Sequence, residues 1–432
     1  MASSSVSSIP DKTKLSYIAV AFFLLVVVGW YIQTIYIRPH GAVDFSIYRY
    51  GAMTIFDNEG YTKNLYDPDL IWLNGSPMPF TYPPFAALVF IPFAFVPFKV
   101  AYGMMLIIIA IIAWYVATVI YNYIAQRGYT IWGQEKMGRL GTIALIAFLT
   151  ICSGPWAKSA DLGQINPILL TLVLADFVRP ATRVPRGFLI GLAAGIKLVP
   201  LVFGLILLIR RDWKGIITLG LSFVGTILLG FILLPNDAPK FWFESVTNVS
   251  RVGDINFVDN ISIQGWLMHF GLRDPMLKYT YYLIAVLAIA LTAIILYQLQ
   301  RREMVLSQVG ITGLLMVSLS PISWSHHFVW FPIVIVALIV DAFPVFFKHL
   351  SKPEYIIAQI CAWVGCVGLY ISPRVLGDHI WGHLGNLNHY IPNVVIGALP
   401  IFCLFIVAIV ILARASLTKP IRQEKEMSYL SS

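Results

Sequence analysis

Long apolar runs separated by shorter polar connections repeat along almost the whole chain of 432 residues. An α-helix needs about 20 residues to cross a membrane, and no stretch of this chain is polar enough to cover a separate soluble domain. The pattern therefore predicts an all-α polytopic membrane protein. The runs lie roughly at residues 15–37, 100–124, 138–156, 214–235, 278–298, 308–323, 328–347, 355–372 and 391–413, with a shorter one at 166–178.

The domain organisation follows from the same pattern. The first run, 15–37, is too long for a signal peptide and lacks a small-residue cleavage pattern, so we expect it to remain as the first span. We expect a cytoplasmic tail at 1–14, a single transmembrane domain at 15–415 and a second cytoplasmic tail at 416–432. No internal repeat is visible.

Two apolar segments need a separate interpretation. Segment 187–209 has cations at both ends and Gly195, Lys197 and Pro200 in its middle. We expect both ends to face the cytoplasm, with a break between Gly195 and Pro200 that lets two short helices enter and return and leaves Lys197 near the outer surface. Segment 83–97 contains four prolines, which favours one non-spanning helix in the outer interface. The total is about 12 membrane segments.

Composition and charge agree with this class. Apolar residues make up 58% of the chain and charged residues 12%, which excludes an ordinary soluble domain. A net charge of +9 would suggest nucleic acid in a soluble protein. With both termini in the cytoplasm, however, the inner loops carry the cationic excess, as the positive-inside rule requires. No nucleic-acid partner is therefore predicted.

The polar sequence gathers on the outer side of this topology. Two long connections, 38–99 and 236–277, and shorter ones around 154–165, 322–327 and 373–390 contain seven of the eight histidines and most of the polar, aromatic-rich sequence. Loops carried by a rigid scaffold are the usual place for binding and catalytic residues. We therefore expect the functional site at the outer face.

Asp44 follows the first span by a few residues and begins an amphipathic stretch suited to the interface. A carboxylate at the boundary between water and lipid is partly desolvated, which raises its basicity and makes it a candidate general base. Two structural alternatives remain open, a helix N-cap and a surface ion pair with Arg49.

Three further features fall on the same face: the amides Gln164 and Asn166 at the mouth of a span, Lys197 in the break, and the paired His326 and His327. Together they supply the hydrogen-bond donors that a desolvated phosphate needs, without a metal. The alternatives are helix capping or interhelical bonding for the amides, snorkelling for the lysine and structural hydrogen bonds for the histidines. No metal site is predicted at the histidines, because adjacent histidines point apart and no third ligand is suitably spaced. No cofactor is predicted, and the sequence leaves a metal requirement open.

The large outer loop and its neighbours add polar groups next to aromatic ones. Arg251, Asn260 and Gln264 lie downstream of an aromatic cluster, and Tyr82 and Trp324 lie in two other outer connections. Such mixtures hold sugars or lipid headgroups. The alternative is an interfacial aromatic belt with polar turns.

Taken in order, these motifs resemble a known family, the polyprenyl-phosphate-mannose-dependent α-1,2-mannosyltransferases of actinobacteria in glycosyltransferase family 87. The resemblance runs from about residue 15 to 415. It rests on Asp44, Tyr-Pro-Pro at 82–84, Gly-Gln-Ile-Asn at 163–166, Ala-Gly-Ile-Lys-Leu-Val-Pro at 194–200, Ser-Arg-Val-Gly-Asp at 250–254, Asn-Ile-Ser-Ile-Gln-Gly at 260–265 and Pro-Ile-Ser-Trp-Ser-His-His at 321–327.

The resemblance implies a GT-C fold in the plasma membrane, with an active site at the outer face and interfacial helices beside it. It implies an inverting transfer of mannose from polyprenyl-phosphate-mannose to a mannosylated glycolipid, either a phosphatidylinositol mannoside, lipomannan or lipoarabinomannan, with membrane lipids around the protein. Asp44 would be the general base, because an inverting displacement needs one carboxylate. Lys197, His326, His327 and Arg251 would bind the donor phosphate. The sugar or acceptor would be bound by Gln164, Asn166, Tyr82, Asn260, Gln264 and Trp324.

Two rival functions remain. Arabinofuranosyltransferases of the same family use polyprenyl-phosphate-arabinose, but they lack the paired histidines and the Gln-Ile-Asn run. A secondary transporter or flippase for lipid-linked sugars would favour inverted repeats and ionisable residues throughout the depth of its spans. Neither feature is evident, so a mannosyltransferase is preferred.

Overall fold

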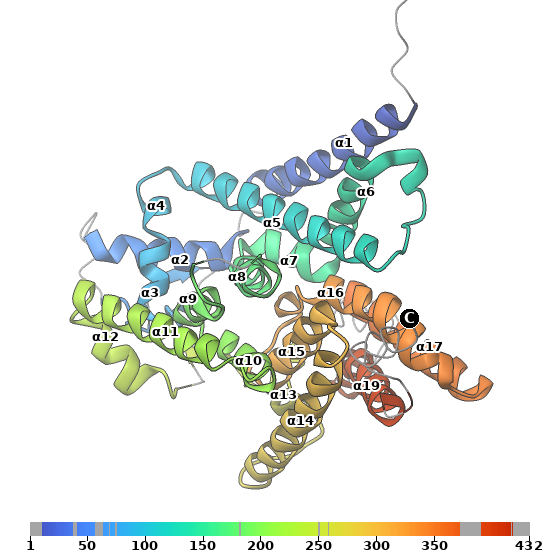
Figure 1. The fold of residues 1–432 in the computed structure, drawn as a ribbon. Coiled ribbons are helices and arrows are strands. Elements are labelled where there is room, and N and C mark those ends of the chain that lie inside the picture. Colours follow the sequence, from blue (N-terminus) through green and yellow to red (C-terminus); the bar gives the residue numbers. More distant parts are fainter. Residues whose placement is uncertain are drawn as a thin grey trace, which may run out of the picture.

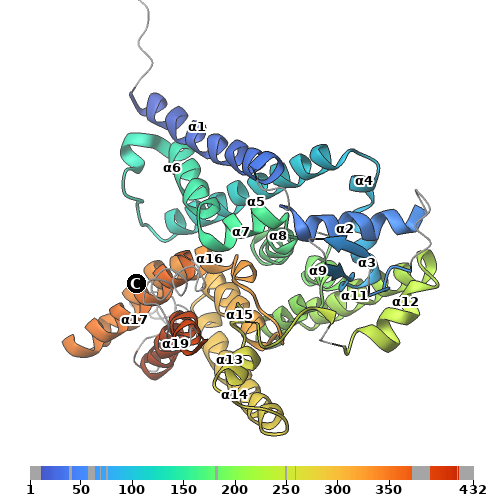
Figure 2. The ribbon, with the colours of Figure 1, turned by 180° about the vertical axis from the view of Figure 1, so that it is seen from behind.

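The computed structural model describes residues 11–37, 41–56, 64–68, 70–73, 76–180, 183–248, 251–257, 259–371, 390–415 and 417. These residues form a helical protein with one short antiparallel hairpin, in which β1 (Ile71–Leu73) pairs with β2 (Ser76–Met78) (Figures 1 and 2). The predicted tails and the connection at 373–390 lie almost wholly outside the described residues.

The α-helices are α1 (Asp11–Ile32), α2 (Val43–Met53), α3 (Pro84–Val89), α4 (Ile91–Ala94), α5 (Phe98–Gln126), α6 (Gln134–Ile151), α7 (Gly154–Leu162), α8 (Asn166–Val178), α9 (Phe188–Ile196), α10 (Gly204–Ile209), α11 (Trp213–Leu233), α12 (Asp237–Lys240), α13 (Ile263–His269), α14 (Met276–Gln300), α15 (Val305–Leu319), α16 (Phe331–Val336), α17 (Lys352–Ile371) and α19 (Tyr390–Ala415). Short 3₁₀ or π turns are η1 (Gln33–Ile37), η2 (Thr54–Phe56), η3 (Val199–Phe203), η4 (Phe241–Ser245), η6 (Ser325–His327), η7 (Ala337–Phe346) and η8 (Phe347–His349).

The prediction of an all-α polytopic membrane protein is confirmed. Among the described residues, six helices are long and apolar enough to cross a membrane, and all six coincide with predicted runs: Thr13–Ile37, Phe98–Gln126, Trp213–Leu233, Met276–Gln300, Phe331–His349 and Lys352–Ile371. The run predicted at 138–156 is divided, because α6 and α7 are bent by 73° at their junction. Several other apolar helices, including α8 and α15, are shorter.

The break predicted in segment 187–209 is present. Helix α9 ends at Ile196, Lys197 has an extended backbone with φ −150° and ψ 130°, and a 3₁₀ turn containing Pro200 leads into α10. Pro200 has no N–H to continue a helix, which accounts for the interruption. Upstream, α9 packs closely on α11: a Cβ at Gly195 would lie 2.2 Å from Thr226 Oγ1.

Segment 83–97 differs from the expectation of one interfacial helix. It forms two short helices, α3 and α4, which meet at Phe90. Pro92, at the second position of α4, cannot donate a backbone hydrogen bond, so the helix cannot run through it unchanged. Arg49 of α2 donates to the carbonyls of Phe93 (3.0 Å) and Val96 (2.9 Å), which fixes the end of this pair against α2.

Helix α8 occupies the centre of the molecule. In Figures 1 and 2 it lies between the group formed by α1, α5 and α6 and the group that contains α15 and α16. It contacts α5, α9 and α15. Its first residue, Asn166, lies at one end of this packed interior and its last, Val178, at the other, so α8 connects two regions that are separated by about 20 Å of helix.

Candidate active site

A cavity of about 510 Å³ opens between α2, α7, the break after α9 and η6. Apolar residues, among them Val43, Ile47, Leu198 and Phe241, form much of its wall. The charged, imidazole and polar aromatic side chains that line it are Asp44, Tyr82, Lys158, Lys197, Arg251, Asp259, Trp324, His326 and His327. A lipid-linked polar substrate needs such a mixture of surfaces.

Asp44 lies in the first turn of α2 and faces this cavity. Its carboxylate accepts a hydrogen bond from Gln164 Nε2. Burial raises the pKa of Asp44 to about 6, although the bond from Gln164 and the charge of Lys197 oppose the rise. The N-cap of α2 is Ala42 and not Asp44, and Arg49 bonds to the carbonyls beyond α4, so neither structural alternative for Asp44 is realised.

Gln164 is the centre of the hydrogen-bond network. Its Oε1 accepts from the Tyr48 hydroxyl (3.1 Å) and from Asn166 Nδ2 (3.1 Å), which leaves Nε2 to donate to Asp44 and towards His326 Nε2 (3.2 Å). Gln164 is buried, with 1% of its surface exposed. The amide therefore orients the carboxylate and fixes the His326 tautomer, with its proton on Nδ1.

Lys197 lies next to this network. Its Nζ is 3.4 Å from Asn166 Oδ1, 3.4 Å from His327 Nε2 and 5.6 Å from the centre of the Tyr82 ring. Within the described part of the chain, no carboxylate forms an ion pair with Lys197. The ammonium group is thus held by neutral partners, and an anion in the cavity would complete its coordination.

The paired histidines are neutral donors and acceptors. Burial, reinforced by Lys197, holds the pKa of His326 and His327 well below the usual value. The backbone N–H of Trp324 lies 3.3 Å from His327 Nδ1, and Lys197 lies 3.4 Å from His327 Nε2. A neutral imidazole has only one acceptor nitrogen, so with Nδ1 accepting from Trp324 the ring proton lies on Nε2, which then cannot also accept from Lys197.

The remaining predicted site residues differ in whether they line the cavity. Tyr82, Arg251 and Trp324 line the cavity; Arg251 donates to Tyr66 O (2.8 Å), and the Trp324 ring lies beside both histidines. Asn166 supports Lys197 from a buried position. Asn260 and Gln264 do not line the cavity.

Asn260 has a different task in the structure. Its amide donates to the carbonyls of Ile255 and Pro321 and accepts from the backbone N–H groups of Ser262 and Ser323. Two of these bonds lie within the large loop and the other two join it to the connection that carries the histidines, so all four hydrogen-bonding positions of the amide are occupied. Gln264 lies in the first turn of α13, the helix that Ser262 caps at its N-terminus.

Three further residues of the site were not predicted from the sequence. Tyr48 bonds to Gln164 and to the Tyr82 hydroxyl (3.0 Å), Lys158 lines the cavity and pairs with Asp161 (3.0 Å), and Asp259 lines the cavity and accepts from Ser325. A signal existed for Lys158: it stands three residues before Asp161, the spacing at which two opposite charges meet on one face of a helix.

The fold and this cavity define an integral membrane protein whose helices enclose a cavity lined by the carboxylate of Asp44 and the ammonium group of Lys197. The model of glycosyltransferase family 87 matches residues 80–321. The chain belongs to this family and is a glycosyltransferase.

Curated relatives lie in mycobacteria. The chain is 31% identical over 325 residues, 72% of each chain, to the polyprenol-phosphate-mannose-dependent alpha-(1-2)-phosphatidylinositol mannoside mannosyltransferase of Mycolicibacterium smegmatis. It is 30% identical to the Mycobacterium tuberculosis protein of the same name, over 67% of this chain and 68% of that one. It is 32% identical to a phosphatidylinositol pentamannoside mannosyltransferase of M. smegmatis, over 68% of this chain and 69% of that one. No solved structure matches the chain significantly.

Proposed function

We propose that this protein transfers mannose from polyprenyl-phosphate-mannose to a phosphatidylinositol mannoside, with inversion at the anomeric carbon and formation of an α-1,2 linkage. Lipomannan or lipoarabinomannan would be alternative acceptors of the same chemistry. The relatives' names support the donor and the acceptor. The observation that carries the proposal is that one cavity is lined by Asp44 and by Lys197 with His327.

The reaction is a single displacement. As an acceptor hydroxyl oxygen attacks the anomeric carbon, Asp44 takes the hydroxyl proton and the bond between that carbon and the phosphate oxygen breaks. The electron pair of the broken bond leaves with the polyprenyl phosphate. Lys197 and the neutral imidazole of His327 face the position where this negative charge increases, and Arg251 extends the cationic wall. Phosphate is already a stable leaving group, so no separate acid is required.

Reconstitution tests the proposed function directly. Purified protein in liposomes is given radiolabelled polyprenyl-phosphate-mannose and phosphatidylinositol mannosides of increasing length, and the product is digested with an α-1,2-specific mannosidase. We expect a labelled product that releases its label on digestion. A parallel reaction with polyprenyl-phosphate-arabinose distinguishes the arabinosyl alternative. Transfer from that donor alone would contradict the proposal.

The proposed mechanism predicts a loss of activity on acidification. Only the ionised form of Asp44 can accept a proton, and its pKa is raised to about 6. We therefore expect kcat/KM to be level above pH 7 and to fall below pH 6, by up to tenfold per pH unit, instead of near pH 4 as for an ordinary aspartate. Donor binding, measured over the same pH range, should not fall with it. A fall only near pH 4 would argue against Asp44 as the base.

We also propose that the chain has the GT-C fold, with about 12 membrane segments, both termini in the cytoplasm and the active-site cavity at the outer face of the plasma membrane. The basic connections after α5, α8 and α10 support this orientation.

Two exposed aromatic residues test the orientation. Phe243 (79% exposed) lies in the proposed outer loop, and Trp132 (91% exposed) lies in the connection between α5 and α6 on the proposed inner side. In a background without the four native cysteines, we expect Phe243→Cys to react with an impermeant thiol reagent in intact cells. Trp132→Cys should react only after the membrane is opened. The reverse pattern would overturn the topology.

A further inference from the structure

A second cavity, of about 410 Å³, lies at the other end of α8 from the candidate active site. The ends of α5, α8, α10 and α14 and the start of α15 form its wall. Three guanidinium groups line it, those of Arg179, Arg186 and Arg210, and we call it the basic cavity. The carboxylate in its lining, Glu303, is exposed at the rim. The lining charge is therefore positive.

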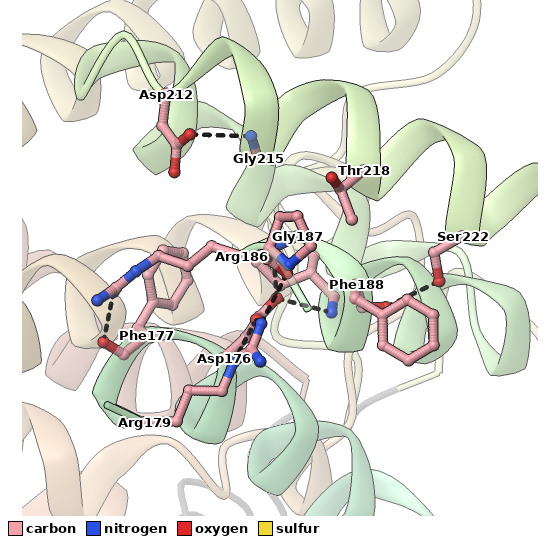
Figure 3. A network of polar contacts seen from close by, with 12 residues as sticks. Asp176, Phe177, Arg179, Arg186, Gly187, Phe188, Asp212, Gly215, Thr218 and Ser222 are labelled. Carbon is pink, nitrogen blue, oxygen red and sulfur yellow. Dashed lines mark hydrogen bonds and ion pairs between the residues drawn. The ribbon is translucent and has the colours of Figure 1, made fainter. Parts of the chain in front are cut away.

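Arg179 and Arg186 are fixed in position by the end of α8 (Figure 3). The buried carboxylate of Asp176 accepts from Arg179 Nε (3.1 Å) and Nη2 (2.8 Å), and its other oxygen accepts from the backbone N–H of Gly187 (2.7 Å). Arg186 donates to the carbonyl of Phe177 (2.7 Å), a neutral group. Asp176 thus compensates the charge of Arg179 and joins α8 to α9, while Arg186 keeps its full charge.

Arg210 approaches the cavity from the end of α10. Its guanidinium donates to Gln308 Oε1 (Nε at 3.1 Å) and lies over the Phe177 ring, 5.2 Å from its centre. Gln308 in turn donates to Gln300 Oε1 (3.0 Å). The partners of Arg210 are therefore amides and an aromatic face. In the part of the chain that the structure describes, neither Arg186 nor Arg210 forms an ion pair.

Arg186 and Arg210 also repel one another. Burial and the charge of Arg186 lower the pKa of Arg210 to about 10, against a smaller opposing effect of Asp212. Asp212 caps α11 by accepting from Gly215 N (2.9 Å; Figure 3). The two guanidinium groups are held close together by neutral groups. One anion that contacts both of them would offset their repulsion.

We propose that the basic cavity binds a phosphate-bearing anion, either the headgroup of an anionic phospholipid or a soluble polyphosphate. A planar guanidinium matches a phosphate group in shape and forms two parallel hydrogen bonds with it. Basic pockets between transmembrane helices are typical headgroup sites, and Val119, Val178, Val305 and Leu306 in the lining would accommodate the adjoining apolar part of a lipid. The bound anion would stabilise the ends of α8 and α9, whose opposite ends carry Asn166 and Lys197.

A ligand titration without any catalytic readout tests this site. Purified protein in a neutral detergent is unfolded thermally in the presence of dihexanoyl phosphatidic acid, pyrophosphate or dihexanoyl phosphatidylcholine at matched ionic strength. Phosphatidic acid should raise Tm in a saturable way, whereas phosphatidylcholine should not. An equal or larger effect of pyrophosphate identifies a soluble polyphosphate as the ligand. No saturable effect of either anion on the wild-type protein overturns the proposal, whatever the variants do.

The double substitution Arg186→Gln and Arg210→Gln locates the site. Loss of two charge-assisted bonds should weaken anion binding by about a hundredfold or more. Lys214→Gln, a neutralisation at an exposed position after α10, is the matched control and should bind as wild type does. Unchanged binding in the double variant, or an equal loss in the control, would mean that the anion binds elsewhere. If the double variant does not fold, Arg186→Gln alone gives the same comparison with the control.

Discussion

Asp44→Asn is expected to reduce mannose transfer by a factor of about 100 to 10,000 while donor binding stays close to that of the wild type. Asparagine keeps an oxygen that can accept the hydrogen bond from Gln164, so the network around α2 is preserved. It cannot accept the proton of the acceptor hydroxyl. Folding should not suffer, because burial already disfavours the charged form of Asp44 in the native protein.

The measurement is turnover per folded molecule at saturating donor, together with the donor Kd. Glu244→Gln, at an exposed position in the proposed outer loop, removes the same charge outside the cavity and should behave as the wild type does. Wild-type turnover in Asp44→Asn would rule out Asp44 as the base. A structural role would instead lower stability and leave the surviving folded protein active.

Lys197→Met is expected to weaken donor binding by about tenfold to hundredfold, the usual effect of losing a charge-assisted hydrogen bond of about 1.5–3 kcal/mol. Methionine retains much of the apolar stem but neither the charge nor the donors. Among the described residues no carboxylate forms an ion pair with Lys197, but its charge acts on the buried Asp44, so the substitution should also raise the pKa of Asp44.

Polyprenyl phosphate without a sugar makes this test specific. If Lys197 contacts the phosphate, Lys197→Met should weaken binding of free polyprenyl phosphate and of the mannosylated donor by similar factors. Lys240→Met removes a cation that pairs with Asp67 at 3.0 Å outside the cavity, and it serves as the control. Unchanged affinity for both lipids in a folded Lys197→Met protein would show that the lysine is structural.

The sequence could predict the spans and the break near Lys197 because both depend on local chemistry. A long apolar run has few alternatives to a helix in a membrane, and a proline inside such a run interrupts it. The meeting of Asp44, Gln164, Lys197 and His326 could be predicted for a related reason. Polar groups beside apolar spans are costly unless they find partners or line a cavity, and they stood on one side of the expected topology.

Other features depend on contacts that no local pattern reveals. The amide of Asn260 bonds to four backbone groups of two distant loops, and the same amide in a sequence equally suggests a sugar ligand. In the sequence, nothing distinguishes Tyr48 from other interfacial tyrosines. Its role depends on the hydrogen bond that its hydroxyl donates to Gln164. The position of the end of α4 against α2 depends on how Arg49 binds the carbonyls of Phe93 and Val96, a contact across more than 40 residues.

The close packing of α9 on α11 bears on how the donor is received. Side chains at Gly191 and Gly195 would overlap α11, with a Cβ at Gly195 only 2.2 Å from Thr226 Oγ1, so the backbone that leads to Lys197 has little freedom to move. In the proposed function, the ammonium group is therefore in place before the lipid phosphate arrives. Preorganised charges need no rearrangement when negative charge develops on the leaving group, which makes their effect on the transition state larger. Gly191 and Gly195, six and two residues before Lys197, thereby fix the backbone that carries the lysine without lining the cavity.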